Sequence, residues 1–237
     1  MDRRRLLALA LMTFFMAGFA TADIVTFSGQ DDGSPTTGPF PNSIAAYTQF
    51  ATAGAALSPL GTITFENQPI GFNSNFSAAA GVNITIINAP DFGDGITGIS
   101  TTTFGNLYGF NTTPGGSKWL GFPGWSAEVT FAEPTDYFGF WLTGVQSRFS
   151  PSEIAVTFHD GTAQILEAPI SENGGAAFFG FTDAGKSISA ITISNFSGDF
   201  WGIDDVAYNA VPEPSSVLLL GACAFGLARL LSRVPRE

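Results

Sequence analysis

The chain has 237 residues, a formal net charge of −11 and only 12% charged residues, while 45% of its residues are apolar. That apolar fraction is enough to build a core and argues against wholesale disorder. Between Asp23 and Ala210 there are 17 acidic residues against three basic ones, a net charge of −14, so nucleic acid is excluded as a favourable partner. The only cysteine, Cys223, lies near the C-terminus, so the region before it has no disulfide or thiol chemistry.

Residues 1–22 have the layout of a secretory signal peptide. A basic start, Met1–Arg5, precedes the apolar run Leu6–Phe19, and Ala20-Thr21-Ala22 offers small residues where signal peptidase cleaves. Cleavage is therefore expected before Asp23. An uncleaved membrane anchor is the alternative, but the apolar run is short for a bilayer span.

Residues 23–210 are expected to form one domain, with a loop and a helix near its start. Asp31–Pro41 is rich in Gly and Pro and predicts a loop. Asn42 is expected to cap a short helix that runs to about Ala53, with Ile44, Tyr47 and Ala51 on one face.

Most of the domain predicts strands, because short alternating runs rich in β-branched and aromatic residues are separated by Gly, Pro, Asn and Asp. The expected strands are Ile24–Ser28, Thr62–Glu66, Val82–Ile87, Ala127–Phe131, Tyr137–Thr143, Glu153–Phe158, Thr162–Glu167, Ala176–Phe181, Ile188–Ser194 and Trp201–Tyr208, with a weak one at Phe104–Phe110. Their spacing is typical of an all-β antiparallel sandwich or barrel. His159-Asp160-Gly161 predicts a tight hairpin turn.

Residues 211–237 form a tripartite tail. Val211-Pro212-Glu213-Pro214 should be extended because its prolines prevent helix, and the apolar segment Val217–Ala228 then favours a hydrophobic helix. Arg229, Arg233 and Arg236 follow, which favours a cytoplasmic C-terminus. The apolar segment is near the lower limit for spanning a bilayer, so an ordinary tail anchor is the weaker interpretation.

This tail resembles the PEP-CTERM sorting signal of Gram-negative bacteria. The resemblance implies processing by signal peptidase and then by an exosortase near Val211, Pro212, Glu213 and Pro214. It also implies association with exopolysaccharide and biofilm, and a location at the cell surface or in the extracellular matrix after transient anchoring in the inner membrane through the tail.

The central domain resembles the β-sandwich of PEP-CTERM proteins and, at the level of fold, jelly-roll carbohydrate-binding modules. Ile63-Thr64-Phe65-Glu66, Phe138-Gly139-Phe140 and Trp201-Gly202-Ile203-Asp204-Asp205-Val206 carry the resemblance. It implies a structural calcium ion held by Glu66 and Asp205, with Asp204 as the substitute. Asp204 and Asp205 would point to opposite faces of a strand unless a bulge intervenes. Solvated carboxylates at turns and sheet edges are the alternative.

Sugar binding would need exposed aromatic rings, and loops at the end of a sandwich are where ligands usually bind. Trp119 and Trp125, with Tyr108 nearby, lie in the loop-rich stretch Asp91–Gly124 and its edge and are the candidate sugar contacts. Buried loop anchors are the alternative for the two tryptophans. Trp141 and Trp201 lie within strand patterns and are expected in the core.

Catalysis has little support in the sequence. The single histidine, His159, lies in the expected turn, and no activated serine is marked. Glu128, Glu133 and Asp136 could supply a carboxylate pair for glycoside hydrolysis. The sequence therefore predicts an exported, non-enzymatic surface or matrix protein associated with polysaccharide. A secreted glycoside-active enzyme or a purely structural matrix protein is the alternative.

Overall fold

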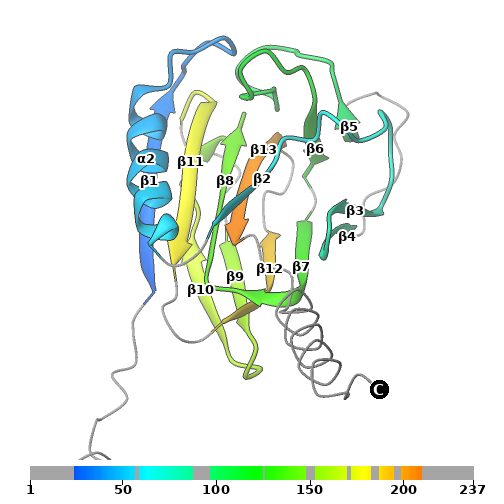
Figure 1. Ribbon diagram of the computed structural model, residues 1–237. Coiled ribbons are helices and arrows are strands. Elements are labelled where there is room, and N and C mark those ends of the chain that lie inside the picture. The colour runs from blue at the N-terminus through cyan, green and yellow to red at the C-terminus, as the bar shows by residue number, and fades with distance from the viewer. Residues whose placement is uncertain are drawn as a thin grey trace, which may run out of the picture.

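The computed structural model describes residues 24–56, 59–87, 97–124, 126–147, 153–169, 172–182, 187–194 and 199–209. They form two antiparallel sheets packed face to face, with one helix on the outer side of one sheet (Figure 1). Within these residues no helix has the length and apolarity to cross a membrane. The predicted signal peptide and hydrophobic tail helix lie outside the described residues.

The first sheet has seven strands and is called the seven-stranded sheet. Its order is β1 (Val25–Asp32), β11 (Gly175–Thr182), β8 (Tyr137–Thr143), β13 (Phe200–Asn209), β6 (Trp119–Pro123) and β5 (Gly98–Ser100), with β2 (Leu60–Ile63) also beside β13. The six-stranded sheet has the order β10 (Ala163–Glu167), β9 (Glu153–Phe158), β12 (Ile188–Ser194), β7 (Ser126–Thr135), β4 (Val82–Ile87) and β3 (Asn75–Ala79).

The two sheets differ in how their strands are buried. In the six-stranded sheet β9 alternates between buried and half-buried positions, because only one face packs on the core. In the seven-stranded sheet every residue of β8 and β11 is buried. Both faces of these central strands are therefore covered, which matches their almost continuous apolar sequence.

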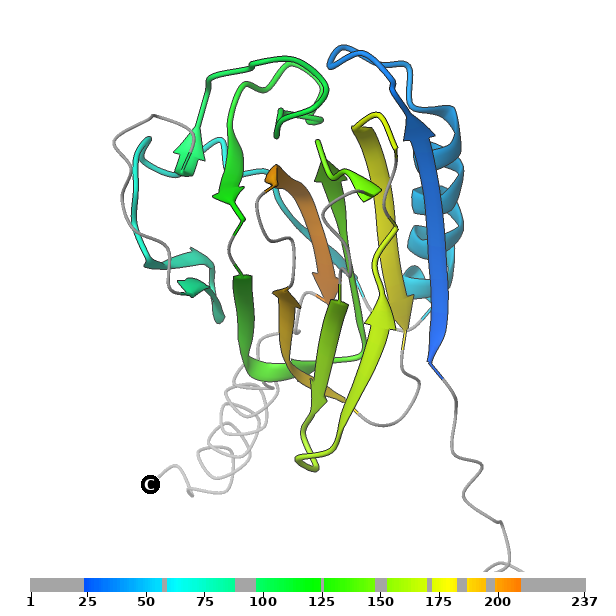
Figure 2. The same cartoon turned by 180° about the vertical axis from the view of Figure 1, so that it is seen from behind.

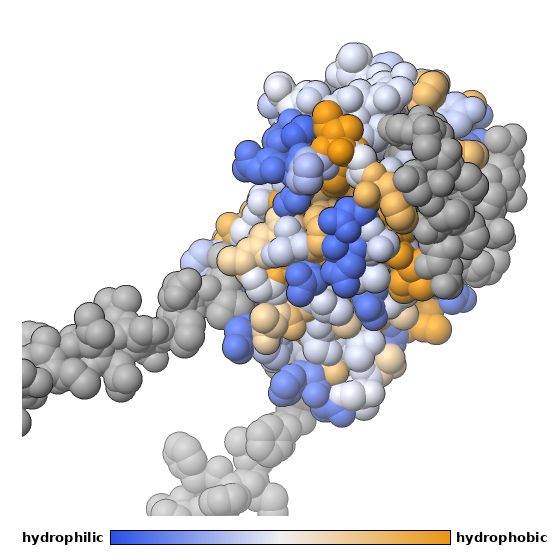
Figure 3. Space-filling model, turned by 90° about the vertical axis from the view of Figure 1, so that its right-hand side faces the viewer, coloured by the Kyte–Doolittle hydropathy of each residue, from blue (hydrophilic) through white to orange (hydrophobic). Residues whose placement is uncertain are grey.

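The second cover is α2 (Pro41–Ala55), which packs against β1 and β11. Viewed from behind, the helix and β1 lie together at one side of the molecule (Figure 2). On the opposite side, where β3 to β5 lie, the coloured part of the surface mixes hydrophilic and hydrophobic residues (Figure 3).

The register of β8 shows how one strand serves two cores. Phe138 and Phe140 point into the large cluster between the sheets, which also contains Trp201. Tyr137 and Trp141 belong instead to a smaller cluster beneath α2, centred on the fully buried Phe50. The expectation that Trp141 and Trp201 are buried is thus confirmed.

The helix is capped from another element rather than by Asn42. Asp31, at the end of β1, accepts hydrogen bonds from the Asn42 N–H at 3.0 Å, from the Ser43 N–H at 2.9 Å and from the Ser43 hydroxyl at 2.7 Å. These N–H groups in the first turn have no partner within the helix, and the carboxylate also complements the positive end of the helix dipole. The predicted Asn42 cap is therefore wrong.

The most buried face of the helix is not the predicted face of Ile44, Tyr47 and Ala51, although Tyr47 packs against the smaller cluster. The buried face is Ser43, Ala46, Phe50 and Gly54, whereas Ile44 is 50% exposed. The reason lies in the sheet below, where the Phe50 ring packs directly on Gly139 and Gly180. Two adjacent strands thus provide a surface without side chains that admits an aromatic ring, and this contact sets the rotation of the helix.

The prediction of an all-β antiparallel sandwich with one helix is confirmed, and four strands have the predicted bounds: β4, β8, β9 and β12. The turn at His159 is confirmed by the β9–β10 hairpin. Strands β3, β5 and β6 were not predicted, and Phe104–Phe110 is turn and loop rather than strand.

Candidate functional site

The site lies where β13 changes its pairing partner from β6 to β2, which leaves a gap between those two strands. The first half of this strand pairs with β6, with Ile203 opposite Leu120, and the second half pairs with β2, with Val206 opposite Ile63. Asp204 and Asp205 lie where one partner ends and the other has not begun. The chain after β2 and the chain before β6 therefore meet at these two residues.

A bulge at this position turns both carboxylates to one loop. The register of β13 against β8 shifts between Asp204 and Ala207, and Asp205 has a positive φ of 44°. A bulge removes the strict alternation of a strand, and Asp tolerates the left-handed region better than most residues. Asp204 then accepts hydrogen bonds from the N–H groups of Thr112 and Thr113, and Asp205 accepts hydrogen bonds from their hydroxyl groups. From the sequence, a bulge was expected to be needed for Asp204 and Asp205 to face the same site.

Asp204 holds the loop that precedes β6. Its Oδ2 accepts the Thr112 N–H at 2.7 Å and the Thr113 N–H at 3.1 Å, and the Asn111 amide at 3.2 Å. Its Oδ1 is buried without a hydrogen-bond partner. Asp204 is itself fully buried, so it fixes the loop from beneath.

Glu66 holds the other end of the same loop. Its Oε1 accepts the Ser117 and Lys118 N–H groups, both at 2.8 Å, and the Asn111 amide at 3.3 Å. The Lys118 ammonium donates to the carbonyl oxygens of Glu66 at 2.7 Å and Gln68 at 2.8 Å. Phe65 has a φ of 60°, which is unusual for a bulky residue and marks a constrained turn beside Glu66.

The carboxylates repel one another in this setting. Burial and, secondarily, the nearby charge of Asp205 raise the pKa of Asp204 to about 7, although backbone hydrogen bonds to its carboxylate act in the opposite direction. Burial, and secondarily the charge of Glu66, raises the pKa of Asp205, while hydrogen bonds from Thr113 and Thr112 oppose the shift. Burial, with the charge of Asp205, also raises the pKa of Tyr47. Negative charge is thus concentrated here.

The predicted calcium ligands Glu66, Asp204 and Asp205 are brought to one loop. They form a hydrogen-bonded cluster with the loop of residues 111–118, and this cluster is called the clasp. Glu66 Oε1 and Asp204 Oδ2 already accept several N–H donors, whereas calcium takes six to eight oxygen ligands. The described residues contain no group of three His, Cys, Asp or Glu side chains arranged to hold a metal ion. As placed, these residues do not fit calcium.

The clasp forms one wall of a pocket of about 810 Å³. The other walls come from the loop after β1, from α2, from the β2 edge and from β8. Its lining residues are Thr36, Thr37, Gly38, Pro39, Phe40, Ile44, Tyr47, Thr62, Thr64, Asn111, Thr112, Thr113, Pro114, Gly115, Gly116, Trp141 and Asp205. This volume is in the range of small-molecule sites.

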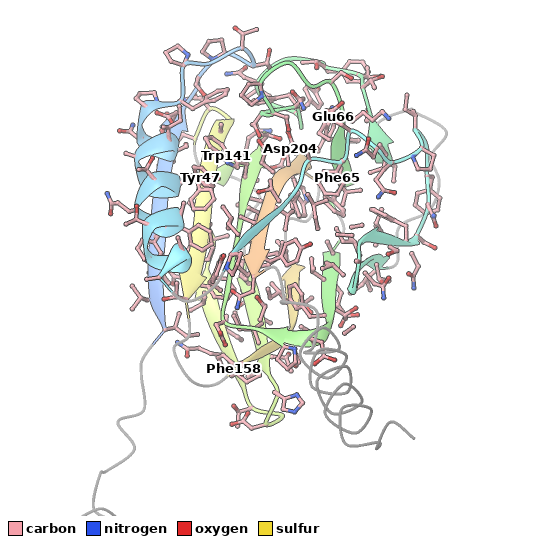
Figure 4. The ribbon with its side chains drawn as sticks, viewed as in Figure 1. Tyr47, Phe65, Glu66, Trp141, Phe158 and Asp204 are labelled. Atoms are coloured by element: carbon pink, nitrogen blue, oxygen red, sulfur yellow. The ribbon has the colours of Figure 1, made fainter. Side chains whose placement is uncertain are left out.

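The pocket combines aromatic rings, hydroxyl groups and a carboxylate. The rings of Tyr47 and Trp141 lie with centroids 6.5 Å apart at 45°. Figure 4 shows these two residues, Asp204 and Glu66 in the same half of the molecule, with Phe158 near the opposite end. Six threonines line the pocket, and Asp205 reaches it from β13.

The predicted sugar contacts have different outcomes. Trp119 is fully buried, with its ring against Gly109 and Gly202, so its prediction as a sugar contact is wrong. A ring that packs on backbone offers no free face. Trp125 lies outside the described residues. Tyr108 is exposed and contacts the exposed Phe104 and Phe200, at centroid distances of 5.9 Å and 6.0 Å.

The other candidates lie away from this pocket. Glu128 is on β7 of the six-stranded sheet, Glu133 is exposed on the same strand, and Asp136 accepts the Asn209 amide. Two further acidic residues have structural roles, because Asp31 caps α2 and Asp32 accepts hydrogen bonds from Asn173. None of these residues is among the described residues that line the pocket.

Sequence reasoning missed the residues that make the site. Asn111, Thr112 and Thr113 carried no signal beyond a polar loop, although three consecutive side chains rich in donors are suited to binding carboxylates. Tyr47 was placed on the helix face towards the core, and Trp141 was assigned to the core alone.

Comparison with known families decides the identity of the tail. A model of the PEP-CTERM protein-sorting motif matches residues 210–233. The chain carries a PEP-CTERM sorting motif. This PEP-CTERM motif implies an exported protein with a C-terminal sorting signal that is targeted to an exosortase. The residues that form it lie outside the described part of the structure.

The remaining comparisons add no conclusion on function. No curated protein matches the sequence of this PEP-CTERM chain. It is similar to the K1 cleaved adhesin domain of Lys-gingipain from Porphyromonas gingivalis W83, at 11% identity and a TM-score of 0.36, over 65% of this chain and 100% of that one. It is also similar to the CBM22-1–GH10 modules of Clostridium thermocellum xylanase 10B in complex with xylohexaose, at 10% identity and a TM-score of 0.31, over 64% of this chain and 28% of that one. Likeness at these scores carries no functional argument.

Proposed function

We propose that the exported domain binds a segment of extracellular polysaccharide in the pocket beside α2. The protein would then be a non-enzymatic, exosortase-processed component of the cell surface or matrix, associated with exopolysaccharide or biofilm. The observation that carries this proposal is the pocket itself, where Tyr47 and Trp141 lie beside threonine hydroxyls and Asp205. Sugars present apolar ring faces and polar edges, and such a lining offers partners for both.

The same pocket gives less support to a glycoside-active enzyme. Glycoside hydrolysis usually needs two carboxyl groups on either side of the scissile bond. Asp205 is the only carboxylate among the described residues that line the pocket, and Asp204 is fully buried behind it. Release of reducing sugar by the wild-type protein, lost in Asp205→Asn, would favour the enzyme.

Two exposed isoleucines provide a matched test of polysaccharide binding. Ile44 lines the pocket and is 50% exposed, whereas Ile165 is 63% exposed on β10 of the other sheet. Ile44→Arg should block the pocket and reduce retention of the exported protein on immobilised polysaccharides, while Ile165→Arg should not. If the wild-type protein is retained on no polysaccharide, the proposal is wrong. If both variants lose retention equally, the polysaccharide binds outside the pocket.

Calcium binding at Glu66, Asp204 and Asp205 stays a prediction. It would require the clasp to rearrange, so that more oxygen atoms could face the ion. Calcium at about 100 times its dissociation constant should stabilise the fold by about 2.7 kcal/mol. Thermal unfolding of the exported protein with calcium and with a chelator measures this, and an unchanged midpoint would rule it out.

The sorting motif gives a separate test of processing. In a host with an exosortase, the mature protein should lack Cys223 and the residues after it. In a host without one, the protein should stay associated with the inner membrane. Mass spectrometry of the native protein distinguishes these states, and an intact tail at the cell surface would contradict exosortase processing.

A further inference from the structure

The pocket holds a carboxylate, that of Asp205, which no described basic side chain neutralises. Among the described residues, the carboxylate oxygens of Asp205 accept hydrogen bonds from hydroxyl groups, that of Thr112 at 3.2 Å and that of Thr113 at 2.7 Å. Among the described residues that line the pocket there is no lysine, arginine or histidine. Two further carboxylates, Asp204 and Glu66, are held by the same loop.

The nearest described cation is turned to other partners. The Lys118 ammonium binds the carbonyl oxygens of Glu66 and Gln68 and does not line the pocket. Among the described residues Asp204 Oδ1 has no hydrogen-bond partner, although it is buried. The charged side chain among the described lining residues is therefore a carboxylate, that of Asp205.

The walls around this charge also suit a cation. Tyr47 and Trp141 are the two aromatic residue types that attract cations best, and a cation is held when it lies within about 6 Å of a ring centroid. Tyr47 is the more accessible of the two rings, because it is half-buried while Trp141 is only 7% exposed, and their centroids are 6.5 Å apart. Asp205 is close enough for its charge to act on the Tyr47 hydroxyl.

A neutral sugar and an amino sugar would meet this pocket differently. A neutral ligand would displace water from Asp205 and leave the charge without a counter-charge, which is unfavourable. A protonated amine would form a charge-assisted hydrogen bond with the same carboxylate, and such bonds are roughly twice as strong as neutral ones. The pocket should thus discriminate by charge as well as by shape.

We propose that the pocket recognises a protonated amine carried on a sugar ring, as in a polysaccharide that contains free, non-acetylated amino sugars. Tyr47 contacts the ring and the cation, Asp205 binds the amine, and the threonines bind neighbouring hydroxyls. This inference rests on the proposed polysaccharide binding and names the class of sugar.

Two oligosaccharides of the same length and linkage provide the test. Glucosamine hexamer carries amines, and N-acetylglucosamine hexamer carries neutral amides in the same positions. Calorimetric titration of the exported protein at neutral pH, in low and in high salt, gives both dissociation constants. The amine-bearing hexamer should bind about tenfold more tightly or better, and the preference should persist in high salt, because a contact inside a pocket is screened less than one at the surface.

Asp205→Asn is the decisive variant, because Asn also tolerates the backbone angle of Asp205. It should abolish the preference for the amine. Asp160→Asn, in the exposed β9–β10 turn, is the matched control and should keep the preference. Tyr47→Leu, which keeps an apolar side chain but removes the ring, should weaken binding of the amine-bearing hexamer and serves if Asp205→Asn does not fold.

The outcomes separate this inference from the proposed function. Equal affinity of the wild-type protein for both hexamers would overturn the amine preference and leave polysaccharide binding in place. If the preference for the amine survives Asp205→Asn or disappears in high salt, the preference comes from the acidic surface of the protein, and the inference is overturned. The inference is also overturned if the wild-type protein binds neither hexamer. The proposed function is tested separately, by retention of the protein on immobilised polysaccharides.

Discussion

The two faces of the seven-stranded sheet are built from the same strands but do different things. The inner face is sealed by the six-stranded sheet, and Phe138, Phe140 and Trp201 lie in its continuous core. The outer face is covered by the single helix α2, which leaves a pocket beside Tyr47 and Trp141. The alternation of β8 therefore divides one strand between the core of the sandwich and the proposed binding pocket.

This difference shows why the site lies where it does. A helix covers a narrower strip than a sheet, so part of the outer face stays open next to β13. The gap between β2 and β6 lies in that open part, and there Asp204 and Asp205 hold the loop before β6. The inner core can thus be altered without reaching the pocket, whereas changes under the helix should affect both.

The largest effect is expected from the inner face. Phe140 is fully buried, so Phe140→Ala should reduce the free energy of unfolding by about 3–5 kcal/mol through lost burial and a cavity. Chemical denaturation measures this loss. Polysaccharide binding per folded molecule should be unchanged, and a binding defect in the folded fraction would contradict the separation of the two faces.

The clasp should make stability depend on pH. Because the pKa of Asp204 is raised from 3.8 to about 7, the folded protein keeps a proton that the unfolded chain loses between these values. The folded state binds more protons there, so stability should fall as the pH rises through this interval, by on the order of 4 kcal/mol. The raised pKa of Asp205 acts in the same direction.

Denaturation at about pH 5 and about pH 8 measures that slope, and Asp204→Asn, which cannot titrate, should flatten it. Stability that increases with pH over this range in the wild-type protein would show that Asp204 is ionised in the fold, and the electrostatic account of the clasp would then be wrong.

A smaller effect is expected under the helix. A Cβ atom at Gly180 would come within 2.6 Å of the Phe50 ring, so Gly180→Ala must displace the ring and the helix. Overpacking of this kind costs about 1–3 kcal/mol. Unlike Phe140→Ala, it should also weaken polysaccharide binding, because α2 carries Ile44 and Tyr47. Unchanged binding would mean that the helix does not position the pocket.

The smallest effect concerns a single hydroxyl. The charge of Asp205 contributes to the raised pKa of Tyr47, so Asp205→Asn should lower that pKa. Ultraviolet difference titration of the variant against the wild type measures the change. A tyrosine titration that is identical in both would place Asp205 too far from Tyr47 to share a ligand with it.

Much of the fold could be predicted because local pattern and tertiary position agree. Alternation in β4, β9 and β12 and the continuous apolar run of β8 gave their bounds directly. The strands that were missed, β3, β5 and β6, lack such a pattern. β5 has three residues, and β6 contains Gly121 and Pro123.

The site was only partly predictable, because it depends on long-range packing. Glu66, Asp204 and Asp205 were recognised as residues that could converge, and they do so through a bulge. Which face of α2 is buried depends on glycines more than eighty residues away along the chain, at Gly139 and Gly180. No local pattern near Tyr47 contains that information, so its place in the pocket could not be derived.

The most direct measurement is a crystal structure of the exported protein soaked with glucosamine oligosaccharide. The account predicts a sugar ring against Tyr47, with its amine within hydrogen-bond distance of Asp205. A sugar bound instead at the exposed rings of Phe104, Tyr108 and Phe200, with the pocket beside α2 empty, would contradict it.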